Sequence, residues 1–227
     1  MTSFGSILRD LDWSYLSDLL IQLIPALLCI MIHEICHGAA AYALGDRTAA
    51  TQGRLSLNPL HLVDWFGLVM LAVFHFGWAK PVSVNMRNFK HPKRDMAITA
   101  LAGPASNFLL AALALFLFGF FFRDLRSAAA GQFVIRLLQY MAILSISLGL
   151  FNLIPIPPLD GSKVLFSCLP DSAYARLMVL ERYGMFLLLA LVFLMNRAFD
   201  VSPIARASQA VYDIFVRIAV FADSLRG

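Results

Sequence analysis

The chain has 227 residues, of which 60% are apolar and 14% are charged. A soluble domain is closer to half apolar, so this composition excludes an ordinary soluble fold and indicates an integral membrane protein. The formal net charge of +4 is modest and the basic residues do not line one helix, so no nucleic-acid partner is expected. The apolar stretches follow one another with one long polar interval, which favours a single domain over residues 1–227.

Three apolar stretches are long enough to cross a bilayer as helices, which takes about 20 residues. They cover residues 19–44, 97–122 and 137–159. A fourth stretch, from Tyr183 to Asn196, is short and needs flanking residues to cross completely. The sequence therefore predicts an α-helical polytopic membrane protein with about four transmembrane helices.

The interval between the first two spans is expected to form a small re-entrant β-hairpin or sheet. Residues 66–78 are apolar but too short to cross as a helix, and Gly67 and Gly77 interrupt them. Residues 48–57 and 79–86 are rich in Thr, Val and Ser with partial alternation, which predicts a short strand on each side of the apolar segment.

The C-terminal part, residues 177–227, is expected to hold the fourth span and an amphipathic helix. From Pro203 to Ala222, a few charged residues are mixed with many apolar ones in a pattern that suits an amphipathic helix lying at the membrane interface. A fifth span at this place would have to bury Arg206, Asp213 and Arg217.

Basic residues indicate how the chain is oriented, because cytoplasmic loops of membrane proteins carry an excess of Lys and Arg. The interval between the first and second spans holds Arg47, Arg54, Lys80, Arg87, Lys90, Lys93 and Arg94. The next connection holds only Arg123 and Arg126. We therefore expect a multi-pass protein of the cell (inner or plasma) membrane, with residues 45–96 in the cytoplasm and the N-terminus outside.

Residues 33–37 read His-Glu-Ile-Cys-His inside the first span. On a helix, His33 and His37 project from one face, so both imidazoles can reach one zinc ion. Glu34 lies beside them, where a carboxylate that does not bind the metal can take a proton from an attacking water. A charge inside a span costs about 2.5–3.5 kcal/mol on insertion scales, so three ionisable residues in one turn favour a functional site over a structural polar cluster.

A catalytic zinc usually has three protein ligands and one open position, so a third ligand is expected elsewhere in the chain. The best candidate is Asp160, which ends the third span where Pro155 and Pro157 interrupt the helix. An Asp-Gly pair also suits a simple turn at the membrane surface. The thiol of Cys36 is an alternative ligand, although packing between helices is the simpler role for it.

Three separated motifs resemble the site-2 protease family of intramembrane zinc metalloproteases, and the chain looks like one of its small bacterial members. The motifs are HExxH at 33–37, Ala-Gly-Pro-Ala-Ser-Asn at 102–107 and the Pro-rich segment 152–161. The similarity extends over most of residues 19–165, which form the expected core. The resemblance implies that His33, His37 and Asp160 bind one zinc ion per chain and that Glu34 is the catalytic base.

The resemblance also implies that Asn107 and Asn152 lie near the reaction centre. One of the two amides would donate to the oxyanion of the reaction or bind the substrate backbone. The alternative for both is a hydrogen bond that ties helices together. The substrate would be a transmembrane segment of another protein, cut in or near the bilayer on its cytoplasmic side. Such a helix must unwind locally, and an open strand edge on the enzyme would help.

A metal-binding membrane protein without protease activity, such as a transporter or a scaffold, is the alternative function. Glu34 argues against it, because neither role requires a base beside an open metal position. Transport would also place polar groups along the whole crossing, whereas the second and third spans concentrate theirs near Asn107 and Asn152.

Overall fold

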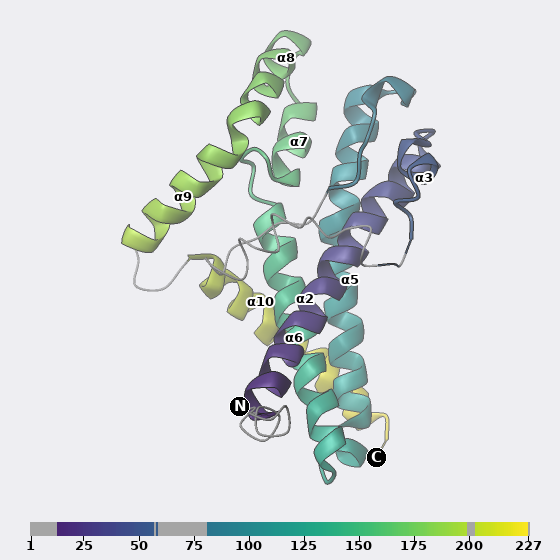
Figure 1. The fold of residues 1–227 in the computed structure, drawn as a ribbon, viewed down its shortest axis with the longest axis vertical. Coiled ribbons are helices and arrows are strands. Elements are labelled where there is room, and N and C mark those ends of the chain that lie inside the picture. Colours follow the sequence, from purple (N-terminus) through teal and green to yellow (C-terminus); the bar gives the residue numbers. More distant parts are fainter. Residues whose placement is uncertain (1–12, 57, 59–80, 199–202, 227) are drawn as a thin grey trace, which may run out of the picture.

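The computed structural model describes residues 13–56, 58, 81–198 and 203–226, and all regular structure in these ranges is helical. The helices are α2 (Trp13–Ala43), α3 (Thr48–Thr51), η2 (Met86–Asn88), α5 (Pro92–Leu125), α6 (Ala129–Asn152), α7 (Asp160–Ser167), α8 (Asp171–Leu180), η3 (Glu181–Tyr183), α9 (Gly184–Ala198) and α10 (Pro203–Ser224). In Figure 1, α3, α7 and α8 lie at the upper end of the molecule, and the first turns of α2 and the C-terminus lie toward the lower end.

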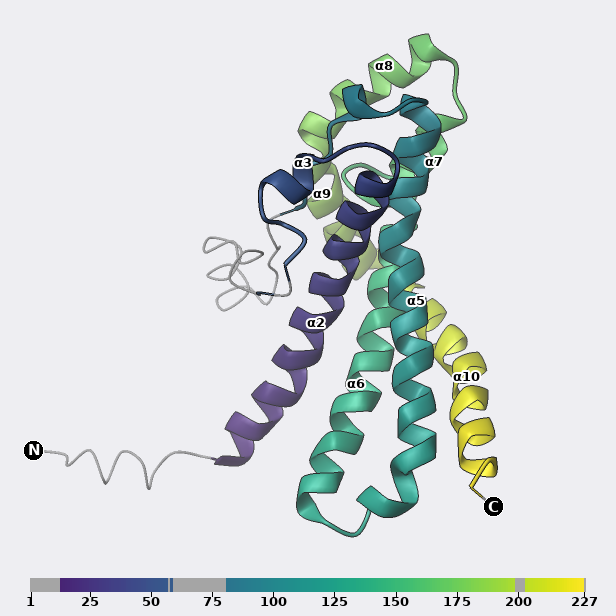
Figure 2. The same ribbon diagram turned by 90° about the vertical axis from the view of Figure 1, so that its right-hand side faces the viewer.

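Three helices are long and apolar enough to span a membrane, namely Leu20–Ala43 within α2, all of α5 and all of α6. They confirm the three longest predicted spans and form the bundle seen in Figure 2. Helix α6 ends at Asn152, before the predicted end of this span at Leu159. Proline cannot continue the hydrogen-bond ladder of a helix, and Pro155 is the first of three prolines that follow.

Helix α5 is the central element and contacts α2, α6, α7 and α10. Its buried surface contains many small residues, among them Ala100, Gly103, Ala111 and Ala114. Small side chains let helix backbones approach closely, which is how helices associate in lipid, where burial of apolar surface provides little driving force. This close packing brings α2 and α7 near each other through their shared neighbour.

Helix α10 confirms the predicted C-terminal helix and packs along the second half of α5 (Figure 2). Gly119 of α5 makes this approach feasible, because a Cβ there would overlap the carbonyl oxygen of Ala219. Near the end of both helices, the guanidinium of Arg123 pairs with the carboxylate of Asp223 at 2.8 Å. The C-terminal helix is therefore part of the bundle.

The interval after α2 differs from its prediction. The strand expected over residues 48–57 is wrong, since Thr48–Thr51 forms the short helix α3. Asp46 contributes to the difference, because its carboxylate accepts hydrogen bonds from the backbone N–H and the hydroxyl of Thr48 and so turns the chain just before α3. Residues 81–85, part of the second expected strand, form no strand in the described part of the chain. The predicted hairpin at 66–78 lies outside the described residues.

The expected fourth span coincides with α9, which has 15 residues. At about 1.5 Å per residue this helix is about 22 Å long, whereas the hydrocarbon core of a bilayer is about 30 Å thick. Helix α9 is therefore too short to cross a bilayer by itself.

Candidate active site

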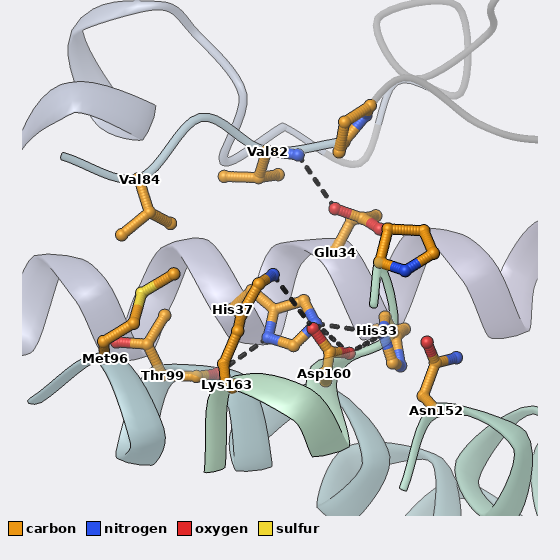
Figure 3. A pocket seen from close by; sticks show the side chains of 13 residues that line it. His33, Glu34, His37, Val82, Val84, Met96, Thr99, Asn152, Asp160 and Lys163 are labelled. Atoms are coloured by element: carbon orange, nitrogen blue, oxygen red, sulfur yellow. Dashed lines mark hydrogen bonds and ion pairs between the residues drawn. The ribbon is translucent and has the colours of Figure 1, made fainter. Parts of the chain in front are cut away.

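Ionisable side chains from two distant parts of the chain meet between α2 and α7 (Figure 3). His33 and His37 project from one face of α2, and their Nε2 atoms are 2.9 Å apart. Oδ2 of Asp160, the first residue of α7, lies 3.1 Å from Nε2 of His33 and 3.0 Å from Nε2 of His37. The three residues are only 4%, 8% and 6% exposed. Among the described residues, they form the group that could hold a metal ion.

The turn between α6 and α7 carries Asp160 to this position. Helix α6 ends at Asn152, the Pro-rich segment reverses the chain, and α7 begins at Asp160. Gly161 is required next, because a Cβ there would overlap the carbonyl oxygen of Leu153 and push α7 away from the end of α6. The Asp-Gly pair therefore combines a ligand candidate with the close approach that positions it.

Each imidazole is held on the side that faces away from Asp160. Nδ1–H of His37 donates to the carbonyl oxygen of Thr99, 2.7 Å away. Nδ1 of His33 lies 3.0 Å from Nδ2 of Asn107. Contacts of this kind fix the ring orientation of metal-binding histidines, and here they leave both Nε2 atoms facing the carboxylate of Asp160.

The three side chains fit a zinc ion. Tetrahedral ligands at about 2.0–2.1 Å from zinc are about 3.3 Å from one another. The donor atoms here are 2.9, 3.0 and 3.1 Å apart, so small shifts would admit the ion. Two imidazoles and one carboxylate are a common ligand set of catalytic zinc.

Gly103 provides the space that the two imidazoles occupy against α5. A Cβ at this position would lie 2.6 Å from Cε1 of His33 and closer still to the ring of His37. Gly103 of the second motif is therefore the position of α5 against which both rings pack.

His33, His37 and Asp160 line a cavity with a volume of about 150 Å³, and Glu34 is also among its lining residues. Its Oε2 atom accepts a hydrogen bond of 2.9 Å from the backbone N–H of Val82, as Figure 3 shows. The carboxylate is not part of the group that could hold a metal ion among the described residues. Glu34 therefore has the position expected of a base that acts next to the metal ligands.

Pro81, Val82 and Val84 form one wall of the cavity. Asp46 anchors the segment that follows, because its carboxylate accepts hydrogen bonds of 2.7 Å from the backbone N–H of Asn85 and from the side-chain amide of Asn88. Burial disfavours the charge of Asp46, but these bonds and those from Thr48 outweigh it and lower the pKa of Asp46. An ionised Asp46 thus ties the cavity wall to the end of α2.

The two asparagines that were predicted to lie near the reaction centre occupy different places. Asn152 lines the cavity, and its Nδ2 donates to the carbonyl oxygen of Leu148 over 3.0 Å. Asn107 is fully buried behind His33 and does not belong to the cavity lining formed by the described residues.

Lys163 is a site residue that the sequence analysis missed. It lines the cavity, and its Nζ lies 3.3 Å from Oδ1 of Asp160, the carboxylate oxygen that the histidines do not contact. Its position three residues after Asp160 on a helix could have indicated the pairing. The contacts of the Thr99 carbonyl with His37 and of the Val82 N–H with Glu34 could not be predicted from the sequence, because they involve backbone groups. Cys36, the alternative ligand, is outside the possible metal-binding group of the described residues.

Comparisons with known proteins point to one protein family. Residues 123–195, which include Asn152 and Asp160, match peptidase family M50. The chain is 38% identical over 183 residues to the "Putative zinc metalloprotease YwhC" of Bacillus subtilis, covering 75% of this chain and 81% of the relative. It is 28% identical over 183 residues to the "Putative zinc metalloprotease Rip2" of Mycolicibacterium smegmatis, covering 79% of this chain and 69% of the relative.

A protein of the same name from Mycobacterium tuberculosis is 28% identical over 170 residues, which cover 73% of this chain and 63% of that relative. No solved structure matched the chain. The similarity to YwhC extends over most of both chains, and the structure brings His33 and His37 of α2 together with Asp160 of α7. The chain therefore belongs to peptidase family M50, the site-2 protease family of zinc metalloproteases.

Proposed function

We propose that the protein is an intramembrane protease that hydrolyses peptide bonds in or near transmembrane segments of other membrane proteins. The observation that carries this proposal is the buried group of His33, His37 and Asp160, with Glu34 beside the same cavity. Helix α2, which holds His33, Glu34 and His37, is long enough to span a membrane, so the substrate bond would be reached within the bilayer.

His33, His37 and Asp160 are the proposed ligands of one zinc ion per chain. Zinc bound there would supply a Lewis acid for a peptide carbonyl and a water molecule. Lys163 pairs with Oδ1 of Asp160 and leaves Oδ2 directed at the histidines, so the carboxylate would offer the metal a single oxygen.

Glu34 is the proposed base. The N–H of Val82 holds its Oε2 atom and so fixes the carboxylate at the edge of the cavity. Glu34 would accept a proton from the attacking water and deliver it to the leaving amide nitrogen. Asn152 also lines the cavity, and the second N–H of its amide could donate to the substrate carbonyl, because the bond to Leu148 uses only one. Asn152 is therefore our candidate for the residue that binds the oxyanion or the substrate backbone.

The substrate segment would have to lose its helical hydrogen bonds before hydrolysis. Pro81, Val82 and Val84 line the cavity with a stretch of chain that is in no helix, and its backbone groups could pair with an extended substrate. Substrate capture along residues 81–85 is thus part of the proposal, whereas the helical α3 gives no such edge.

The proposed location is the cell membrane, with the active site nearer the cytoplasm and all of residues 1–227 in one domain. Helix α9 with its flanking residues is the proposed fourth crossing, and the amphipathic α10 follows it with Arg206, Asp213 and Arg217 exposed. The packing of α10 along α5 supports this arrangement, because it places the C-terminus toward the same end of the bundle as the first turns of α2 (Figure 2).

Two substitutions separate binding of the metal from its use. Glu34→Gln keeps the size and polarity of the side chain, so zinc should stay near one per chain while hydrolysis falls by about 10²–10⁴-fold. Asp160→Ala should lose both zinc and hydrolysis, because two imidazoles alone leave the ion under-coordinated. Elemental analysis of the purified protein and cleavage of a reconstituted membrane substrate measure the two effects.

Full zinc occupancy in Asp160→Ala would place the third ligand elsewhere, and an active Glu34→Gln variant would refute the proposed chemistry. A wild-type protein that binds zinc but cleaves no membrane protein in cells would favour the alternative of a metal-binding protein without protease activity.

A further inference from the structure

Asn107 presents a buried polar atom that the fold does not satisfy. The residue is completely buried in the middle of α5, and its Nδ2 lies 3.0 Å from Nδ1 of His33. In the described part of the chain, its Oδ1 has no hydrogen-bond partner. A buried acceptor without a donor is costly, so its presence beside a ligand candidate calls for an explanation.

The position of one proton on His33 links this atom to the metal site. A neutral imidazole carries hydrogen on one nitrogen and a lone pair on the other. If Nδ2 of Asn107 donates to Nδ1 of His33, the hydrogen must sit on Nε2, where it points at Asp160 and His37 and opposes binding of a cation. If the amide is reversed, Oδ1 accepts from Nδ1–H, and Nε2 presents its lone pair to the site.

The two amide orientations have nearly the same shape, so the hydrogen-bond network decides between them. The reversed orientation gives the oxygen of Asn107 a donor and moves Nδ2 to the position without a partner, so the choice between the orientations depends on the histidine. The reversed orientation also makes His33 equivalent to His37, whose Nδ1–H donates to the carbonyl oxygen of Thr99. Each histidine then has an oxygen acceptor behind it and a free Nε2 in front.

We infer that Asn107 is a positioning residue that accepts the Nδ1–H of His33 through Oδ1, fixes the ring and its tautomer, and thereby sets the zinc affinity of the site. It acts behind the metal ligand and does not touch the substrate. The inference rests on the proposed function in one respect, namely that His33 is a zinc ligand.

The test is the zinc affinity of the purified full-length chain, measured by competition with a chelator of known affinity. Asn107→Ala removes the acceptor and should weaken zinc binding about 10–100-fold. Asn107→Asp keeps an acceptor oxygen and should bind zinc within about threefold of wild type or more tightly, because a carboxylate accepts strongly from Nδ1–H. Ser145→Ala is the control, because it removes a buried polar side chain whose hydrogen-bond partner is Cys29 and not a ligand candidate, and its zinc affinity should equal that of wild type.

Zinc affinity within twofold of wild type in Asn107→Ala would overturn the inference. A tenfold loss in Asn107→Asp would overturn it as well, because it would mean that Asn107 acts as a donor or through its amide as a helix tie. If Asn107→Ala does not fold, Asn107→Asp decides by itself. A wild-type protein that binds no zinc would refute the proposed function, which distinguishes that failure from a failure of this inference.

Discussion

At the scale of single residues, the site depends on Gly103, whose lack of a side chain leaves room for two imidazole rings. Gly103 is buried within α5 and faces the rings of His33 and His37 at a distance that leaves no space for a methyl group. Both rings are also held from behind, by Asn107 and by the carbonyl of Thr99, so they have little freedom to move aside.

Gly103→Ala should therefore reduce zinc affinity by at least about tenfold, because the added methyl group must displace the Nε2 atoms from Asp160. Gly149→Ala is the matched control: it also adds a methyl group inside a long buried helix, but the nearest atom is 3.2 Å away in the ring of Phe108. Chelator competition measures both variants. Equal zinc affinity in the two would show that the histidines adapt to the smaller space.

At the scale of secondary structure, sequence reasoning succeeded where hydropathy alone determines the element. The three long spans were predicted because runs of apolar residues in lipid must satisfy their backbone hydrogen bonds internally, and the C-terminal helix was predicted from its amphipathic pattern. The HExxH helix and the Asp160 turn followed from residue spacing and prolines. The end of α6 at Asn152 was missed, because apolar character continues through the prolines to Leu159 although helical geometry does not.

The strand predicted at 48–57 failed for a different reason. Strand propensity is weak compared with tertiary context, and here the buried carboxylate of Asp46 binds Thr48 and turns the chain just before α3. Contacts made through the backbone, such as those of Val82 and Thr99, could not be predicted, because any residue type can supply them. The hydrogen-bond partner of Asn107 could not be predicted either, because the packing of the helices determines which histidine a buried amide contacts.

The segment at 81–85 gives a prediction at this scale. Val84→Pro removes one backbone donor from the cavity wall and should slow cleavage of a membrane substrate by about 10-fold or more if an extended substrate pairs there, while zinc stays bound. Val84→Ala is the control, because it shortens the same side chain and keeps the N–H. Loss of activity in both variants to the same degree would indicate a side-chain effect, and unchanged cleavage in Val84→Pro would remove this edge from substrate capture.

At the scale of the whole molecule, the bundle has a defined polarity. Helices α2, α5 and α6 alternate in direction, so the turn after α5 lies at the opposite end of the bundle from the start of α5 (Figure 2). The segment before α5 holds Arg87, Lys90, Lys93 and Arg94. By the positive-inside rule we expect this end to face the cytoplasm and the end that carries Ser127 to face outward.

A labelling experiment tests this orientation. In a background without Cys29, Cys36 and Cys168, Lys90→Cys should react with a membrane-impermeant thiol reagent only after the cells are opened. Ser127→Cys, in the turn between α5 and α6, should react in intact cells. Both positions are exposed, so access to the reagent reports the side of the membrane. The reverse pattern would invert the molecule and place the active site nearer the outside.

The hydrogen bond from Val82 to Glu34 has a practical consequence for finding the natural substrates. A glutamine side chain retains an oxygen that can accept the same N–H, so Glu34→Gln should leave the cavity wall in place as well as the metal ligands. A variant that still binds its substrate but cannot hydrolyse it keeps the uncut substrate in the active site. Cross-linking of Glu34→Gln in living cells, followed by identification of the captured chains, would therefore report which proteins enter the cavity.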